Sequence, residues 1–138
     1  MNEKKEVKLK FYGGVGWVTG ANFVIENIPH NVDEKITRIM IDCGMYQGGE
    51  EAGPKNREDF VYDPSTIDIL VLTHAHADHL SAAPFIKART GAKVGIGEHI
   101  KDVQRIFRPV FNATDLDTDG RDFDKLFADG ERFKIGSL

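Results

Sequence analysis

Several features are almost absent from this chain of 138 residues, and each absence narrows the class of protein. Its single cysteine, Cys43, excludes an internal disulfide framework and a zinc cluster built from several cysteines. No apolar run approaches the ~20 residues that a membrane-spanning helix requires, so we expect no membrane protein and no membrane partner. The first residues also lack the apolar stretch of a secretory signal, which together with the lone cysteine favours a cytoplasmic protein.

The chain is also short of positive charge. Its net charge is −4 at pH 7, with 22 acidic against 18 basic side chains. Non-specific nucleic-acid binding scales with the number of phosphates that a protein neutralises, so this composition disfavours it. The exception is the segment 87–108, which has a net charge of +4. We interpret it as a solvated helix face, with contact to one anionic ligand as the alternative.

The periodicity of the apolar residues predicts a mixture of strands and helices. Residues 6–12, 22–26 and 35–42 are predicted to form strands with short connections, as in an antiparallel meander. Residues 67–73 are apolar on both faces, which predicts a buried central strand. Residues 45–63 are predicted to form a long surface loop. The remaining predicted elements are a helix capped by Ser81 and ended by Gly91, a strand at 93–96, helices at 98–107 and 122–128, and a strand at 132–135.

The strongest chemical signal directly follows the predicted central strand. Three histidines and one aspartate fall within six positions, namely His74, His76, Asp78 and His79. Neutral imidazole and carboxylate are the usual protein ligands of zinc and iron. A strand end followed by a tight turn, with only alanines between the first ligands, would hold these side chains together at the rim of a sheet. The sequence therefore predicts a metal site.

This run resembles the His-x-His-x-Asp-His signature of the metallo-β-lactamase superfamily. Residues 8–73 are similar to the RNA-processing nucleases of that superfamily, in the stretches 11–22, 41–49 and 62–68. Residues 74–138 are similar to its persulfide (sulfur) dioxygenases, in the stretches 79–84, 96–100, 103–107 and 123–130. The similarity changes at the metal motif itself, which indicates either a hybrid chain or a branch that carries both sets of features.

The resemblance implies an α/β fold: the first half of a four-layer αβ/βα sandwich, with a mixed sheet and helices on one face. Residues 1–138 would then be one partial domain, because the second half normally supplies a further histidine, a bridging aspartate and often a final histidine. The complete site is implied to hold two zinc ions, with His74 and His76 on the first and Asp78 and His79 on the second. Asp42 is implied to support the metal-site loop.

Three functions stay open at this point. The resemblance implies a metal-dependent hydrolase in which Asp78 binds the second ion or orients the attacking hydroxide; the nuclease-like part favours a phosphodiester substrate such as RNA. The enzymatic alternative is a persulfide dioxygenase with a small-molecule substrate and one Fe(II), held by two histidines and one carboxylate, with His74 among them. The third is a non-catalytic, metal-binding half-domain that completes its site with a partner chain.

The missing half also predicts association. Helices should cover one face of the central strand, whereas Leu70 and Leu72 on the other face would meet water. An exposed apolar patch of that kind usually marks an interface. We therefore expect a homodimer, or a second half-domain that packs on this face, and weak or absent catalysis by the chain alone.

Overall fold

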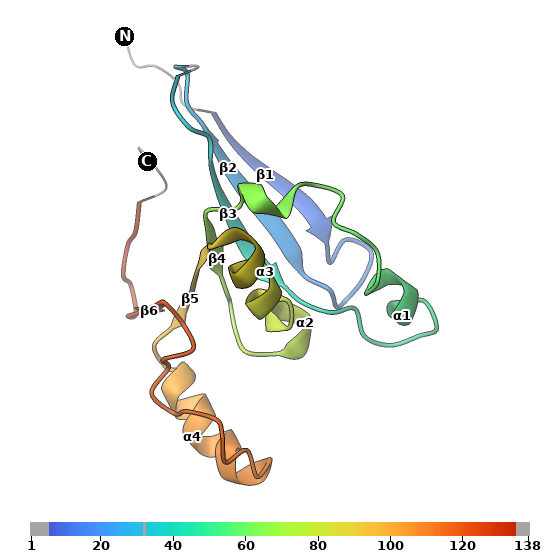
Figure 1. Ribbon diagram of the computed structural model, residues 1–138, viewed down its shortest axis with the longest axis vertical. Coiled ribbons are helices and arrows are strands. Elements are labelled where there is room, and N and C mark those ends of the chain that lie inside the picture. Colours follow the sequence, from blue (N-terminus) through green and yellow to red (C-terminus); the bar gives the residue numbers. More distant parts are fainter. Residues whose placement is uncertain (1–5, 32, 135–138) are drawn as a thin grey trace.

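The computed structural model describes residues 6–31 and 33–134, and a six-stranded mixed sheet forms its centre (Figure 1). The strands lie in chain order across the sheet: β1 (Glu6–Gly13), β2 (Asn22–Ile28), β3 (Thr37–Cys43), β4 (Ile69–Val71), β5 (Lys93–Gly97) and β6 (Lys125–Phe127). Strands β1 to β3 pair antiparallel, and β3 to β6 pair parallel. The carboxyl ends of the four parallel strands therefore meet at one end of the sheet, where α/β proteins usually place their sites.

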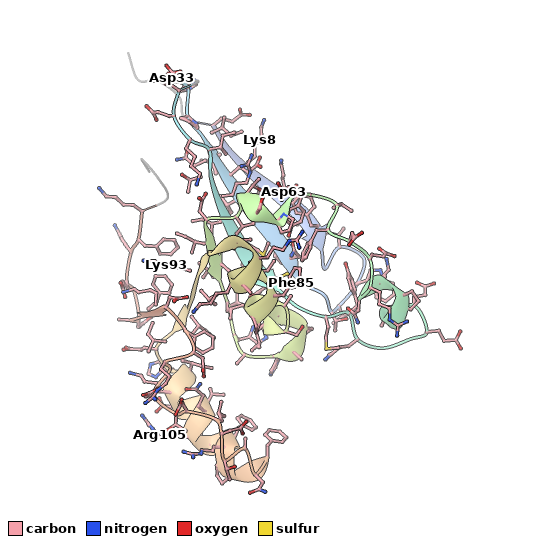
Figure 2. The ribbon with its side chains drawn as sticks, in the orientation of Figure 1. Lys8, Asp33, Asp63, Phe85, Lys93 and Arg105 are labelled. Atoms are coloured by element: carbon pink, nitrogen blue, oxygen red, sulfur yellow. The ribbon has the colours of Figure 1, made fainter. Side chains whose placement is uncertain are left out.

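The helices are short, and most of them lie on one face of the sheet (Figure 1). Their bounds are α1 (Ala52–Lys55), the 3-10 helix η1 (Pro64–Thr66), α2 (Ala77–Leu80), α3 (Ala83–Thr90) and α4 (Ile100–Val110). Figure 2 marks this covered face with Phe85 on α3 and Asp63 before η1. Helix α3 ends at Gly91, which adopts the left-handed conformation (φ 69°) that glycine accepts without steric cost. Helix α4 instead extends away from the sheet and from the other helices.

Alternate residues of the central strands form the core beneath these helices. Val24, Met40 and Leu70 are neighbours across β2, β3 and β4, and each is at most 1% exposed. Ile86 of α3 packs on the same cluster. Leu70 and Leu72 are thus buried under the helices, and the expectation that they lie on the uncovered face is wrong. The prediction failed because β4 is apolar on both sides, so its sequence does not tell which side the helices cover.

The opposite face of the sheet is apolar and is called here the open sheet face. On the edge strand β1, Val7, Leu9 and Phe11 are 54%, 52% and 58% exposed. Their register neighbours on the inner strands are half-buried, except for Ile39, which is 1% exposed. The half-buried residues are Phe23, Ile25, Ile41, Ile69 and Val71. The apolar surface expected for an interface therefore exists, but different residues form it.

The fold class is confirmed: the chain is α/β, with a mixed sheet and helices that mainly cover one face. The antiparallel start, the central strand and the end of α3 at Gly91 are also as predicted. The helix predicted at 122–128 is wrong, because Lys125–Phe127 pairs with β5 as strand β6. The strand predicted at 132–135 is wrong for residues 132–134, which have no regular structure, and Ile135 lies outside the described residues.

Two boundaries also differ from the sequence prediction. Ser81 follows α2 as its C-terminal cap, and Ala82 precedes α3. The segment 45–63 contains the one-turn helix α1. Of the helices in the described part of the chain, none has the length and apolar character that a membrane span requires. The cytoplasmic location stays a prediction.

Candidate metal centre

The motif segment lies against the ends of β2 and β3 through its backbone. The N–H of Ala21 donates to the carbonyl of Asp78 (3.2 Å), and the N–H of Met45 donates to the carbonyl of Ala77 (3.3 Å). The approach is so close at Gly44 that a Cβ atom there would lie 2.0 Å from the carbonyl carbon of Asp78. Only glycine leaves this space, so Gly44 permits the motif to sit on the strand end.

Asp42 connects the motif to strand β3. Its side chain is nearly buried and accepts three hydrogen bonds: from the Thr73 N–H (2.8 Å), the Thr73 hydroxyl (2.7 Å) and the His79 Nδ1 (2.8 Å). A buried carboxylate needs such partners, because an unpaired one would cost several kcal/mol. Asp42 also has a left-handed backbone (φ 56°), a strained conformation for a residue with a side chain. Strain of this kind is concentrated at functional sites.

The same contacts determine which nitrogen each histidine presents. Because Nδ1 of His79 donates to Asp42, its Nε2 is left to act as a ligand, and it lies 3.4 Å from Oδ2 of Asp78. Nδ1 of His74 is 2.9 Å from the Thr73 hydroxyl, so its Nε2 faces the other way and lies 3.2 Å from Nδ1 of His76. The rings of His74 and His79 are 3.9 Å apart between centroids.

The four candidate ligands thus form two pairs of donor atoms with suitable spacing. Two ligands at 2.0–2.1 Å from one tetrahedral zinc ion lie about 3.3 Å apart, close to both observed pair separations. The grouping is incomplete, however: within residues 6–31 and 33–134, no three His, Cys, Asp or Glu side chains are gathered as ligands of one ion. The donor chemistry fits zinc or iron, and each pair would supply two of the four ligands of a tetrahedral ion.

Cys43 lies next to Asp42 but takes no part in this arrangement. It is buried, accepts a hydrogen bond from Nδ2 of Asn22 (3.1 Å), and burial raises the pKa of its thiol to about 11. The Tyr62 hydroxyl donates to Oδ1 of the same asparagine (3.0 Å), and burial raises the Tyr62 pKa as well. Cys43 is therefore a buried side chain held by Asn22, apart from the candidate ligands.

A cavity of about 440 Å³ lies beside the motif, between segment 45–62, the strand ends and α3. Gly44 and Ser81 border it on the motif side, but none of the four candidate ligands lines it. The Ser81 hydroxyl accepts a hydrogen bond from the Met45 N–H (2.9 Å) and so helps to hold the wall in place.

Sequence reasoning missed two residues of this site. Thr73 fixes both Asp42 and His74, and Gly44 gives the motif backbone its room. Their signals were their positions: Thr73 directly precedes the motif, and Gly44 closely follows the implied support residue Asp42. The solitary His99 pairs with Asp102 at an exposed position at the start of α4, so it is a surface residue.

Comparison with known proteins agrees with this architecture. The sequence profile of the metallo-β-lactamase superfamily matches residues 32–136, more than half of the chain. The chain therefore belongs to the metallo-β-lactamase superfamily. A solved metallo-β-lactamase from Elizabethkingia meningoseptica has 25% identity and a TM-score of 0.55, over 93% of this chain and 44% of that protein. The recognition of the superfamily from the motif is confirmed.

Two curated relatives have higher local identity. A β-lactamase hydrolase-like protein of Xylella fastidiosa is 48% identical over 73 residues, which are 53% of this chain and 17% of that protein. A ribonuclease of Thermus thermophilus is 49% identical over 47 residues, which are 34% of this chain and 10% of that protein. The chain thus spans less than a fifth of each of these relatives, and both similarities are local.

Proposed function

We propose that this chain forms the metal-binding half of a hydrolase site, with a phosphodiester such as RNA as the favoured substrate. The observation that carries the proposal is the pairing of donor atoms: His74 with His76, and Asp78 with His79, each at the separation expected for two ligands of one ion. The local similarity to a ribonuclease supports the choice of substrate class.

In this proposal each residue has a distinct task. His74 and His76 hold one divalent ion, and His79 and Asp78 hold the second, with zinc as the expected metal. When bound, such ions would lower the pKa of a water molecule to about 7 and polarise the scissile bond. Asp78 also orients the attacking water through its carboxylate. Asp42 is a positioning residue, because its hydrogen bond to Nδ1 of His79 fixes the tautomer and the ring orientation.

We further propose that a second half-domain, on another segment or another chain, supplies the remaining ligands. The short motif segment would supply two ligands for each ion, and a tetrahedral zinc ion has four ligands. The open sheet face, with Leu9 and Phe11 about half exposed, gives such a half-domain a surface to cover. We therefore expect weak or absent turnover from the isolated chain, because catalytic geometry must hold within ~0.5 Å.

The test is a zinc titration by calorimetry, with bound metal counted by elemental analysis. The double variant His74→Ala/His76→Ala should lose at least half of the bound zinc. The matched control is His30→Ala/His99→Ala, which removes two histidines outside the motif and should leave the stoichiometry unchanged. Unchanged zinc binding in the first double variant would reject the assignment.

The same preparation separates the hydrolase from the dioxygenase alternative. Zinc at the motif, together with cleavage of a model phosphodiester once the second half-domain is present, supports the hydrolase. Stoichiometric iron with oxygen uptake on a persulfide substrate would instead establish the Fe(II) dioxygenase.

A further inference from the structure

Helix α4 carries a stripe of apolar side chains that extends beyond the hydrophobic core against which the start of the helix packs. Ile100, at its start, is 6% exposed and belongs to the core cluster. The stripe then continues at the spacing i, i+3, i+4, i+7, i+8 of one helix face. Its members, called here the α4 stripe, are Val103, Ile106, Phe107 and Val110 of the helix and its C-terminal cap residue Phe111. Figure 1 shows the reason for their exposure: the helix extends beyond the sheet.

The five side chains are strongly exposed for their type. Val103 and Phe107 are 40% and 44% exposed, and Ile106, Val110 and Phe111 are 63%, 67% and 71% exposed. Phe107 and Phe111 stack on each other with centroids 5.6 Å apart, which makes a continuous surface rather than scattered contacts. Contiguous apolar surface of this size is uncommon on a monomer and marks an interaction site.

We propose that a second copy of this chain covers the α4 stripe, as an antiparallel pair of α4 helices about a two-fold axis near Phe107. From Phe107, apolar residues occur at nearly the same spacing toward both ends of the helix. Val103 would face Val110 and Phe111 of the other copy, and Ile106 and Phe107 would meet their own counterparts. A two-fold interface requires this kind of self-complementarity.

The exposed area agrees with a dimer. The five side chains leave about 600 Å² open per copy, so their pairing would remove about 1,200 Å², the lower end of the range for stable interfaces. We therefore expect a dissociation constant in the micromolar range. This interface is separate from the proposed metal site and from the open sheet face, and it does not depend on either.

The charges beside the stripe favour the antiparallel direction. The first half of α4 carries Lys101 and Arg105, of which Arg105 pairs with Asp102, and the segment after its end carries Asp115 and Asp117, of which Asp117 pairs with Arg121. Figure 2 marks Arg105 on the helix. An antiparallel pair places the basic half of one helix beside the acidic segment of the other copy, and it also opposes the two helix dipoles.

Sedimentation equilibrium of the full chain, from ~1 to 100 μM, tests the proposal. The variant Ile106→Glu/Val110→Glu should weaken the dimer by at least 100-fold, because it places charges at the centre of the interface. Leu9→Glu is the matched control: it changes a residue of similar exposure on the open sheet face and should leave the dimer intact. Far-ultraviolet circular dichroism checks that each variant is folded.

A cross-link tests the geometry independently of any loss of folding. Phe107→Cys, next to the two-fold axis, should form an intermolecular disulfide under mild oxidation. Val103→Cys should not, because its counterpart lies about 11 Å away along the helix axis. The native Cys43 is buried and should not interfere. A monomer at 100 μM, a dimer that only Leu9→Glu disrupts, or a monomer that binds anionic vesicles through α4 would each overturn the proposal.

Discussion

The substitution Gly44→Ala should disturb the metal site from a position that donates no ligand. A Cβ atom at residue 44 would lie 2.0 Å from the carbonyl carbon of Asp78 and 2.2 Å from the backbone nitrogen of His79. Ordinary contacts begin near 3.4 Å, so the motif backbone must move by more than 1 Å. That displacement exceeds the ~0.5 Å within which a functional site must be held.

The expected cost has two parts. Overpacking of this kind destabilises a protein by about 1–3 kcal/mol. The backbone hydrogen bonds from Ala21 to Asp78 and from Met45 to Ala77 would also be weakened, at about 1 kcal/mol each. We therefore expect a loss of about 3 kcal/mol in the free energy of unfolding, or roughly 10 °C in Tm for a domain of this size. Zinc affinity should fall at least 10-fold.

Urea unfolding and zinc calorimetry would measure the two effects. The matched control is Gly97→Ala, at the end of β5, where a Cβ atom would meet nothing within 4 Å. Because Gly44 directly follows β3, Gly97 ends β5 and neither glycine has a positive φ, the comparison isolates the close approach. Equal stabilities for the two variants would refute the reasoning.

Three other predictions follow from particular side chains. Asp42→Asn should lower zinc affinity by 10–100-fold in calorimetry, because it removes the carboxylate that orients His79. Cys43 should react with a thiol reagent at pH 8 only in the unfolded chain, because burial raises its pKa to about 11; fast reaction of the folded chain would contradict this. The Lys87 ammonium group holds the pKa of Asp124 below its usual value. Asp124 therefore stabilises the fold above its unfolded-state pKa. Asp124→Asn should cost about 1 kcal/mol at pH 7, and in urea titrations this difference should disappear as the pH falls through the lowered pKa of the folded chain.

The sequence predicted the strands that carry a local pattern. Alternation located β1 to β3, and continuous apolarity located β4. It did not predict β6, because Lys125–Phe127 is a strand only through its pairing with β5. The absence of a side chain at Gly95 allows this: a Cβ there would lie 2.6 Å from the Phe127 ring. Such a tertiary contact has no local signature.

The candidate site likewise has a part that the sequence predicted and a part that it did not. The run from His74 to His79 could be predicted from the sequence, because its candidate ligands are close together in the chain. The bonds from Asp42 to Thr73 and His79 join residues more than 30 positions apart, so spacing alone does not reveal them. Only the family resemblance pointed to Asp42, and the only sequence signal of Thr73 was its position directly before the motif. We expected one uncovered face of the sheet. The sequence did not show which alternate residues of β4 lie on that face, because β4 is apolar on both sides.

The most direct measurement of the central claim is the position of bound zinc, from anomalous diffraction at the zinc edge on crystals of the loaded chain. We expect zinc density on Nε2 of His74 and Nδ1 of His76, with a second position at Asp78 and Nε2 of His79. Zinc bound only at His30 or His99, with the motif empty at saturating zinc, would contradict it.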